Sequence, residues 1–78
     1  MYMKTNVIFK NGVKLVCERV NKMSNLTFLT FEKVCPNKAS ELMNECLKNG
    51  WDFNTLCENE FRISVPTECV ERFEALLF

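Results

Sequence analysis

The stretch PNKASELMNECLKNG, residues 36–50, separates two strand-rich halves of the chain and sets the order of its elements. Pro36 suits the first turn of a helix, Lys48 suits the last turn, and Gly50 suits the left-handed residue that follows a helix. The pattern predicts an amphipathic helix that begins at Pro36 or Asn37 and ends before Asn49-Gly50. Its apolar positions recur at helical spacing: Ala39, Leu42, Met43, Cys46 and Leu47.

Before this helix the sequence predicts strands. Residues 7–9 and 13–17 flank Lys10-Asn11-Gly12, and a three-residue loop with Gly12 left-handed pairs Phe9 with Val13 on one apolar face. A two-residue turn would mix the faces. Residues 21–25 are predicted as a polar connection, and residues 26–31 as a central strand that pairs with the second strand in a meander.

After Gly50 the strand pattern returns. Residues 51–55 and 61–65 alternate between apolar and polar types around a turn at residues 57–60, which predicts a second hairpin. Thr67 suits an N-cap, and the apolar spacing beyond it predicts a closing helix. The positions of that stripe are Val70, Phe73, Leu76 and Leu77.

These elements predict an α+β fold in a single domain of residues 1–78. An antiparallel sheet of four to five strands, with two helices on one face in the order ββ(β)αββα, buries every apolar stripe with short connections. The 47% hydrophobic content and two glycines argue against disorder. The chain has neither an 18-residue apolar run nor a secretion signal, so a cytoplasmic location without membrane contact is expected.

The composition argues against catalysis, because the chain has no histidine, the usual base and the commonest metal ligand. We expect no enzyme activity, no cofactor and no metal. The five cysteines, spaced 18, 11, 11 and 12 residues apart, contain no C-x-x-C pair. Reduced, buried thiols are the favoured interpretation, and a zinc site or a redox pair are the alternatives. The cysteines are Cys17, Cys35, Cys46, Cys57 and Cys69.

Charge is segregated along the chain although the net charge is zero. Residues 1–40 carry seven Lys or Arg and two acids, whereas residues 41–78 carry three and eight. The two sets either pair internally or leave opposed surfaces for a charged partner. The acids are interpreted as a solvated helix face or as a negative patch that docks on a basic groove of a host protein. The partner-binding residues predicted on this basis are Trp51, Asp52, Glu58, Glu60, Glu68, Glu71 and Glu74.

Two alternatives use other features. Basic strands with interleaved aromatics indicate a sheet surface for single-stranded nucleic acid, with Lys10, Lys14, Phe31 and Lys33 as its contacts. The apolar C-terminal tail and the small core indicate a structural homodimer. Trp51 is interpreted as a core residue, or as an interface anchor if it is exposed.

The segment Leu47-Lys48-Asn49-Gly50-Trp51-Asp52 closes an amphipathic helix after a predicted three-strand meander and leads into an acid-rich segment. In this it resembles small prophage-encoded anti-CRISPR proteins, inhibitors of the type II effector nuclease. The resemblance implies a non-catalytic inhibitor from a phage or mobile element. It also implies a host partner that handles nucleic acid, bound through an acidic surface.

Overall fold

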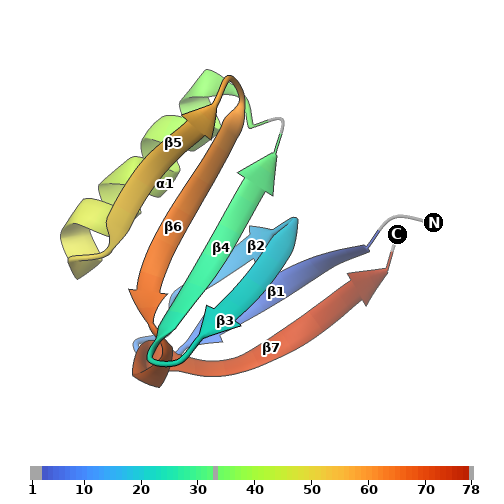
Figure 1. The fold of residues 1–78 in the computed structure, drawn as a ribbon, viewed down its shortest axis with the longest axis vertical. Coiled ribbons are helices and arrows are strands. Elements are labelled where there is room, and N and C mark those ends of the chain that lie inside the picture. The colour runs from blue at the N-terminus through green and yellow to red at the C-terminus, as the bar shows by residue number, and fades with distance from the viewer. Residues whose placement is uncertain (1–2, 33, 78) are drawn as a thin grey trace.

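The computed structural model of the protein describes residues 3–32 and 34–77, which form an α+β fold of antiparallel sheets (Figure 1). Seven strands and one α-helix are present in these residues, in place of the four to five strands and two helices expected. The elements are β1 (Met3–Phe9), β2 (Lys14–Cys17), β3 (Arg19–Met23), β4 (Leu26–Glu32), α1 (Pro36–Asn49), β5 (Asp52–Cys57), β6 (Glu60–Pro66), the 3-10 turn η1 (Thr67–Cys69) and β7 (Val70–Leu77).

The strands form two sheets and not one. The three-stranded sheet has the order β2-β1-β7, and the four-stranded sheet has the order β3-β4-β6-β5. Glu18 alone separates β2 from β3, and its N–H donates to the Thr30 carbonyl at 3.0 Å. The chain therefore passes from one sheet to the other within a single residue (Figure 1).

The first hairpin has the predicted register. Thr5 pairs with Cys17 and Val7 with Leu15, and the Phe9 N–H donates to the Val13 carbonyl at 2.9 Å. Gly12 has a φ of 92°, a left-handed conformation that glycine adopts without steric cost. The three-residue loop is thus confirmed.

The helix α1 has the predicted start and ends one residue later than predicted. It begins at Pro36 and ends at Asn49, and Gly50 caps it with a φ of 73°. The predicted apolar stripe is only partly buried, because Leu42 and Cys46 lie in the core whereas Met43 is 45% and Leu47 74% exposed.

The second hairpin is confirmed as well. β5 pairs with β6, with Phe53 opposite Ile63, and the turn contains Asn59 at a φ of 64°. The register shifts between Thr55 and Cys57. This bulge lies next to the turn that joins β5 to β6.

The predicted polar connection at residues 21–25 is wrong, because Arg19–Met23 is strand β3. It pairs with β4 from Arg19 opposite Thr30 to Met23 opposite Leu26. The predicted pairing of residues 26–31 with the second strand is wrong for the same reason. β4 lies between β3 and β6 in the sheet. The polar sequence of β3 does not indicate a strand, because β3 is held by its backbone hydrogen bonds to β4.

The predicted closing helix is also wrong. Residues after Pro66 form η1 and then β7, which pairs antiparallel with β1. Ile8 pairs with Arg72 and Phe9 with Val70, so Glu71 has no counterpart on β1. This bulge brings Val70 and Phe73, three residues apart, to the same face, and a spacing of three was the basis of the helix prediction.

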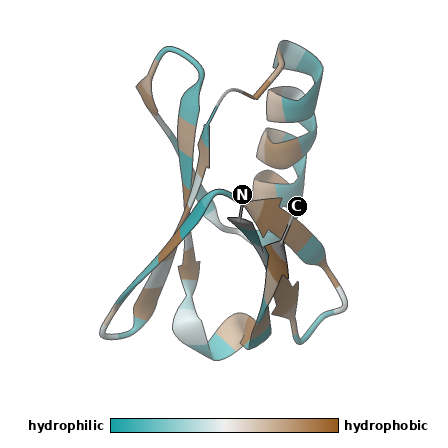
Figure 2. Ribbon diagram, turned by 90° about the vertical axis from the view of Figure 1, so that its right-hand side faces the viewer, coloured by the Kyte–Doolittle hydropathy of each residue, from teal (hydrophilic) through white to brown (hydrophobic). Residues whose placement is uncertain are grey.

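The core lies between the two sheets and α1. It contains Val7, Phe9 and Cys17 from the three-stranded sheet and Leu42 and Cys46 from α1. Trp51 closes it next to Gly50, with its ring stacked on Phe9 at 4.5 Å between centroids. Figure 2 shows hydrophobic and hydrophilic residues alternating along the strands. The core residues of the four-stranded sheet are Leu29, Phe31, Ile63 and Val65.

Candidate functional site

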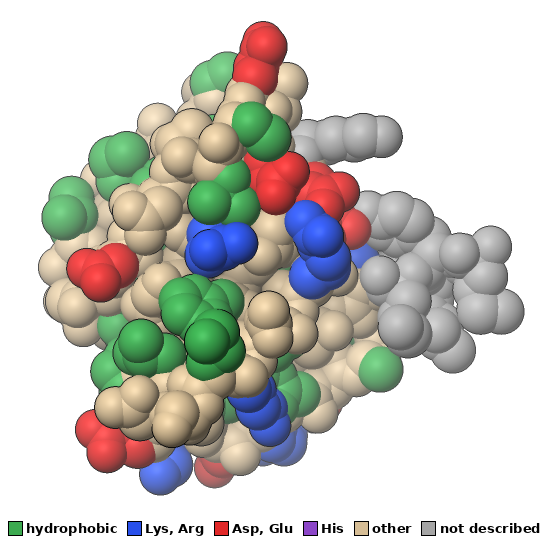
Figure 3. All heavy atoms as spheres, viewed as in Figure 1, with side chains coloured by type: hydrophobic (Ala, Val, Ile, Leu, Met, Phe, Trp, Pro, Cys, Tyr) green, Lys and Arg blue, Asp and Glu red, His purple; other side chains and the backbone are tan. Residues whose placement is uncertain are grey.

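The four-stranded sheet has one buried face and one uncovered face. Leu29 on β4 and Ile63 on β6 belong to the core with α1 and the three-stranded sheet. Side chains alternate along a strand, so the residues between these core positions point to the other side. Figures 1 and 3 look onto that side, where none of the other described elements lies over the sheet.

We call this uncovered side the outer face. Its strand register orders the side chains in rows that run across β3, β4, β6 and β5. From the β3–β4 turn towards the β5–β6 turn, the rows are Met23, Leu26 and Pro66; Asn21, Phe28, Ser64 and Asp52; Arg19, Thr30, Arg62 and Asn54; and Glu32 with Glu60. The face therefore changes from apolar to basic to acidic along the strands, and Figure 3 shows hydrophobic side chains below basic ones, with acidic ones above.

Arg62 lies at the centre of the outer face. Its guanidinium carbon is 5.6 Å from the centroid of the Phe28 ring, a cation–π arrangement. Its Nε is buried and has no hydrogen-bond acceptor among the described residues. A buried donor without an acceptor costs about 1–3 kcal/mol, so the Arg62 side chain is held in this position at an energetic cost.

Arg19 binds the acidic end of the outer face. Its Nη2 lies 2.6 Å from Glu32 Oε1 and 3.3 Å from Glu60 Oε1. The Cys57 thiol donates to Glu60 at 3.4 Å, and this hydrogen bond raises the pKa of Cys57. The acidic row is therefore partly neutralised, and the thiol beside it stays protonated at neutral pH.

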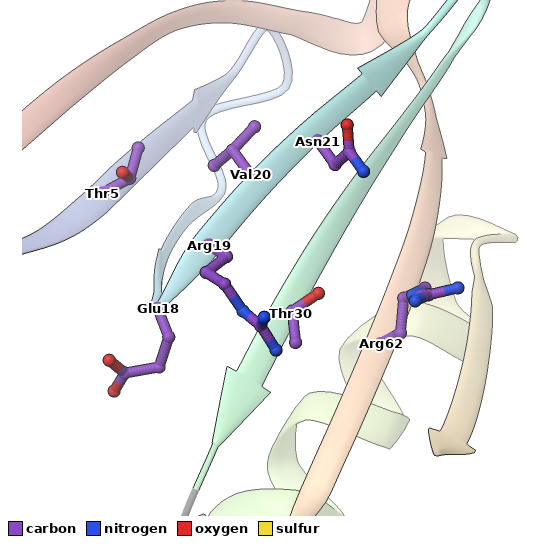
Figure 4. A pocket seen from close by; sticks show the side chains of 7 residues that line it. All are labelled: Thr5, Glu18, Arg19, Val20, Asn21, Thr30 and Arg62. Carbon is purple, nitrogen blue, oxygen red and sulfur yellow. The ribbon is translucent and has the colours of Figure 1, made fainter.

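A pocket of about 440 Å³ continues from this face around the edge strand β3 (Figure 4). Figure 4 shows the Arg19 side chain reaching towards Thr30, with Arg62 on a further strand and Thr5 on the opposite side. Hydroxyl, amide and guanidinium groups line much of it, and these groups bind by hydrogen bonding and ion pairing. The lining residues are Thr5, Glu18, Arg19, Val20, Asn21, Thr30 and Arg62.

The predicted acidic set is divided among several elements. Asp52 and Glu60 lie on the outer face, Glu58 lies in the β5–β6 turn, and Glu68 lies in η1. Glu71 and Glu74 lie on β7 and not on a helix.

Arg72 binds both acids of β7. Its Nη1 lies 3.1 Å from Glu71 Oε2, and its Nε lies 3.1 Å from Glu74 Oε2. The hydrogen bond from Arg72 is the main reason why the pKa of Glu74 is lowered, and Asn6 adds a weaker one at 3.4 Å. This end of the acidic set is therefore partly neutralised within the chain.

Trp51 is 7% exposed and stacks on Phe9, so its ring lies in the core and not on an interaction surface. Next to it, the first turn and the end of α1 are joined, because Asn11 Nδ2 donates to Asn49 Oδ1 at 2.8 Å. The Phe9–Trp51 stack and the Asn11–Asn49 hydrogen bond thus hold the end of α1 against the first hairpin.

The three predicted nucleic-acid contacts that the structure describes do not gather on one surface. Lys10 lies at the first turn and Lys14 on β2, whereas Phe31 is 4% exposed within the core of the other sheet. A ring with that burial has no face free for stacking on a base. Lys33 lies outside the described residues.

The thiols differ in environment. Cys17 and Cys46 are buried, and burial raises the pKa of Cys17 to about 12 and that of Cys46 to about 11. Cys35 and Cys57 are exposed, so the prediction of buried thiols holds for only part of the set. Within residues 3–32 and 34–77, no three Cys, Asp or Glu side chains lie close enough together to hold a metal ion.

Sequence reasoning missed Phe28, Arg19 and Arg62 as a group. Alternation in residues 60–66 already separates Arg62 from the core positions Ile63 and Val65, and this is the signal that was present. Nothing in the sequence indicates that Phe28 and Arg62 lie on adjacent strands, because that contact requires the β4–β6 pairing.

Comparison with known proteins finds no matching family model, no matching curated protein and no matching solved structure. In the part of the chain that the structure describes, α1 is too short and too polar to cross a membrane.

Proposed function

We propose that this protein is a non-catalytic binding module that docks on another protein through the outer face. The observation that carries the proposal is the central Arg62, which packs against Phe28 on a sheet face that no other described element covers (Figure 1). Arginine and aromatic side chains at the centre of a surface are the residue types that contribute most to protein–protein affinity.

The order of the rows specifies what the partner surface needs. A partner carboxylate pairs with the Arg62 guanidinium, and an apolar side chain covers Met23 and Leu26, which are 60% and 40% exposed. The acidic end, Glu32 and Glu60, faces a basic group. Such an arrangement fixes one orientation of the partner, because a reversed partner would place its basic group on the apolar row and its apolar side chain on the acidic row.

The anti-CRISPR resemblance suggests a partner class, a host protein that handles nucleic acid, such as the type II effector nuclease. In this form of the proposal the acidic end of the outer face, together with Glu58 in the adjoining turn, occupies a basic groove of that protein. Cleavage of a target DNA by the guide-loaded nuclease, with and without excess protein, tests this partner. Inhibition that E58Q/E60Q weakens supports the acidic contact, and unchanged cleavage rules this nuclease out.

The docking surface itself is tested with substitutions. Immobilised protein captures partners from a lysate of its host, and the affinity of the captured protein is measured for R62A, F28A and the control K48A. Lys48 lies exposed in the last turn of α1, away from the outer face. We expect R62A and F28A to lose on the order of tenfold or more in affinity and K48A to lose none.

Two results would contradict this function. Equal affinity of R62A and K48A for the captured protein would exclude the outer face as the docking surface. Tight binding of short single-stranded RNA or DNA, at about micromolar protein in fluorescence polarisation, would favour the nucleic-acid alternative.

A further inference from the structure

Strand β7 leaves one long edge of the three-stranded sheet open. Among the described strands β7 is hydrogen-bonded to β1 alone, so its other side presents backbone N–H and C=O groups that no described strand pairs. With eight residues β7 is the longest of the four edge strands, since β2 has four, β3 five and β5 six.

The side chains of β7 are incompletely covered within one chain. None of the residues 70–76 is buried, although Val70, Phe73 and Leu76 are apolar. The strand contains neither proline nor lysine, the residues that commonly protect an edge strand from pairing. The edge is therefore open to another strand.

We propose that β7 pairs antiparallel with β7 of a second copy of this chain, across a two-fold axis at Phe73. The two three-stranded sheets then join into one continuous sheet. This interface lies in the other sheet from the outer face, so it is independent of the proposed docking function.

Charge selects the register. Arg72 and Glu74 pair with Ile8 and Asn6 on β1, so both side chains lie on the same side of the sheet. With the axis at Phe73, each Arg72 lies directly opposite Glu74 of the second copy. An axis one residue earlier would place Arg72 opposite Arg72, and an axis one residue later would place Glu74 opposite Glu74. Only the central register joins opposite charges, and like charges opposite one another destabilise a strand pair.

The side chains of Arg72 and Glu74 are free to form ion pairs with the second copy in place of those within the chain. Arg72 and Glu74 side chains are 54% and 44% exposed, and their contacts within the chain are surface ion pairs that contribute little on their own. On the other side of the sheet, Lys22 Nζ lies 4.4 Å from the centre of the Phe73 ring. That contact lies on the face of the sheet opposite to Arg72 and Glu74 and leaves these two charged groups on the other face.

Sedimentation equilibrium over a wide range of protein concentration tests the proposal. We expect the unmodified protein to form a dimer, and R72E and E74R each to weaken dimerisation about tenfold or more. The double variant R72E/E74R restores opposite charges in crossed order and is expected to restore the dimer. K48E, on the exposed end of α1, serves as the control.

Several results would overturn the proposal. They are a protein that remains monomeric up to about millimolar concentration, single variants that dimerise like the unmodified protein, and a double variant that stays as weak as the single ones. Amide hydrogen exchange gives a second readout that needs no substitution. Slower exchange in β7 at high concentration supports the interface, and exchange there that is independent of concentration excludes it.

Discussion

Phe28 and Leu29 are successive residues of β4 with opposite environments. Leu29 is fully buried in the core, whereas Phe28 lies on the outer face beside Arg62. The same backbone therefore presents one side chain to the interior and the next to solvent. From this difference we infer that the inner face of the four-stranded sheet determines stability and that the outer face determines binding.

The largest expected effect separates these two neighbours. L29A leaves a cavity in the core and is expected to lower the free energy of unfolding by about 2–5 kcal/mol. F28A removes a half-buried ring from the surface, and we expect about half that loss or less. Urea unfolding followed by circular dichroism measures both. Equal losses would show that the outer face is part of the core.

A smaller effect is expected at Thr27, a buried polar residue on the inner face. Its hydroxyl lies 2.9 Å from the hydroxyl of Thr67 and ties β4 to η1. T27V keeps the volume but removes the hydrogen bond, so we expect a loss of about 1 kcal/mol in unfolding free energy. A double-mutant cycle with T67V isolates the pair, and additive losses would mean that the hydroxyls do not interact.

The buried thiol of Cys17 predicts that the stability of the protein depends on pH. The pKa of Cys17 is raised to about 12 by burial, and a raised pKa favours the protonated thiol in the folded state. Its contribution to stability is therefore complete below the unfolded value of 9.0 and is lost as the pH rises from there towards about 12. Thermal unfolding should accordingly shift to lower temperature as the pH rises above about 9.

The same thiols give a labelling measurement. With a thiol reagent at about pH 8, we expect Cys35 and Cys57 to react in the folded protein, Cys57 slowly because its hydrogen bond to Glu60 raises its pKa, and Cys17 to react only as the protein unfolds. Peptide mass spectrometry identifies the sites. Rapid labelling of Cys17 in the folded state would contradict its place in the core.

The smallest effect on stability is expected for R19A on the outer face. Arg19 is 61% exposed, and ion pairs at such positions contribute about 0–1 kcal/mol. The change in unfolding free energy should therefore stay below about 1 kcal/mol and should shrink further in high salt. A loss as large as that of L29A would mean that the acidic row is structural.

Local sequence signals were sufficient for three parts of the fold. The helix α1 follows from the spacing of Leu42 and Cys46 and from the stop at Gly50, and the two hairpins follow from alternation and turn residues. Each of these elements is specified by residues close together in the sequence. Gly12 even determines the register of the first hairpin, since its φ of 92° allows the three-residue loop.

The strands β3 and β7 could not be predicted in this way, because distant pairing forms them. β3 is polar and is held by β4, and β7 is held by β1 from the opposite end of the chain. The bulge at Glu71 gives β7 an apolar spacing that resembles a helix. Tertiary pairing therefore overrode the local pattern.

The candidate site was partly hidden for the same reason. Charge segregation predicted an acidic surface, but folding places Arg19 from the first half against Glu60 from the second at 3.3 Å. Asp52 and Glu60 do lie on the outer face, yet its centre is Arg62. A cross-strand contact such as that between Arg62 and Phe28 is invisible until the order of the strands is known.

Hydroxyl-radical footprinting of the protein in complex with its captured partner tests the role of the outer face most directly. We expect slower oxidation of Met23, Leu26 and Phe28, with unchanged oxidation of Met43 and Leu47, which are exposed on α1. Protection of the two helix residues, with none on the outer face, would contradict it.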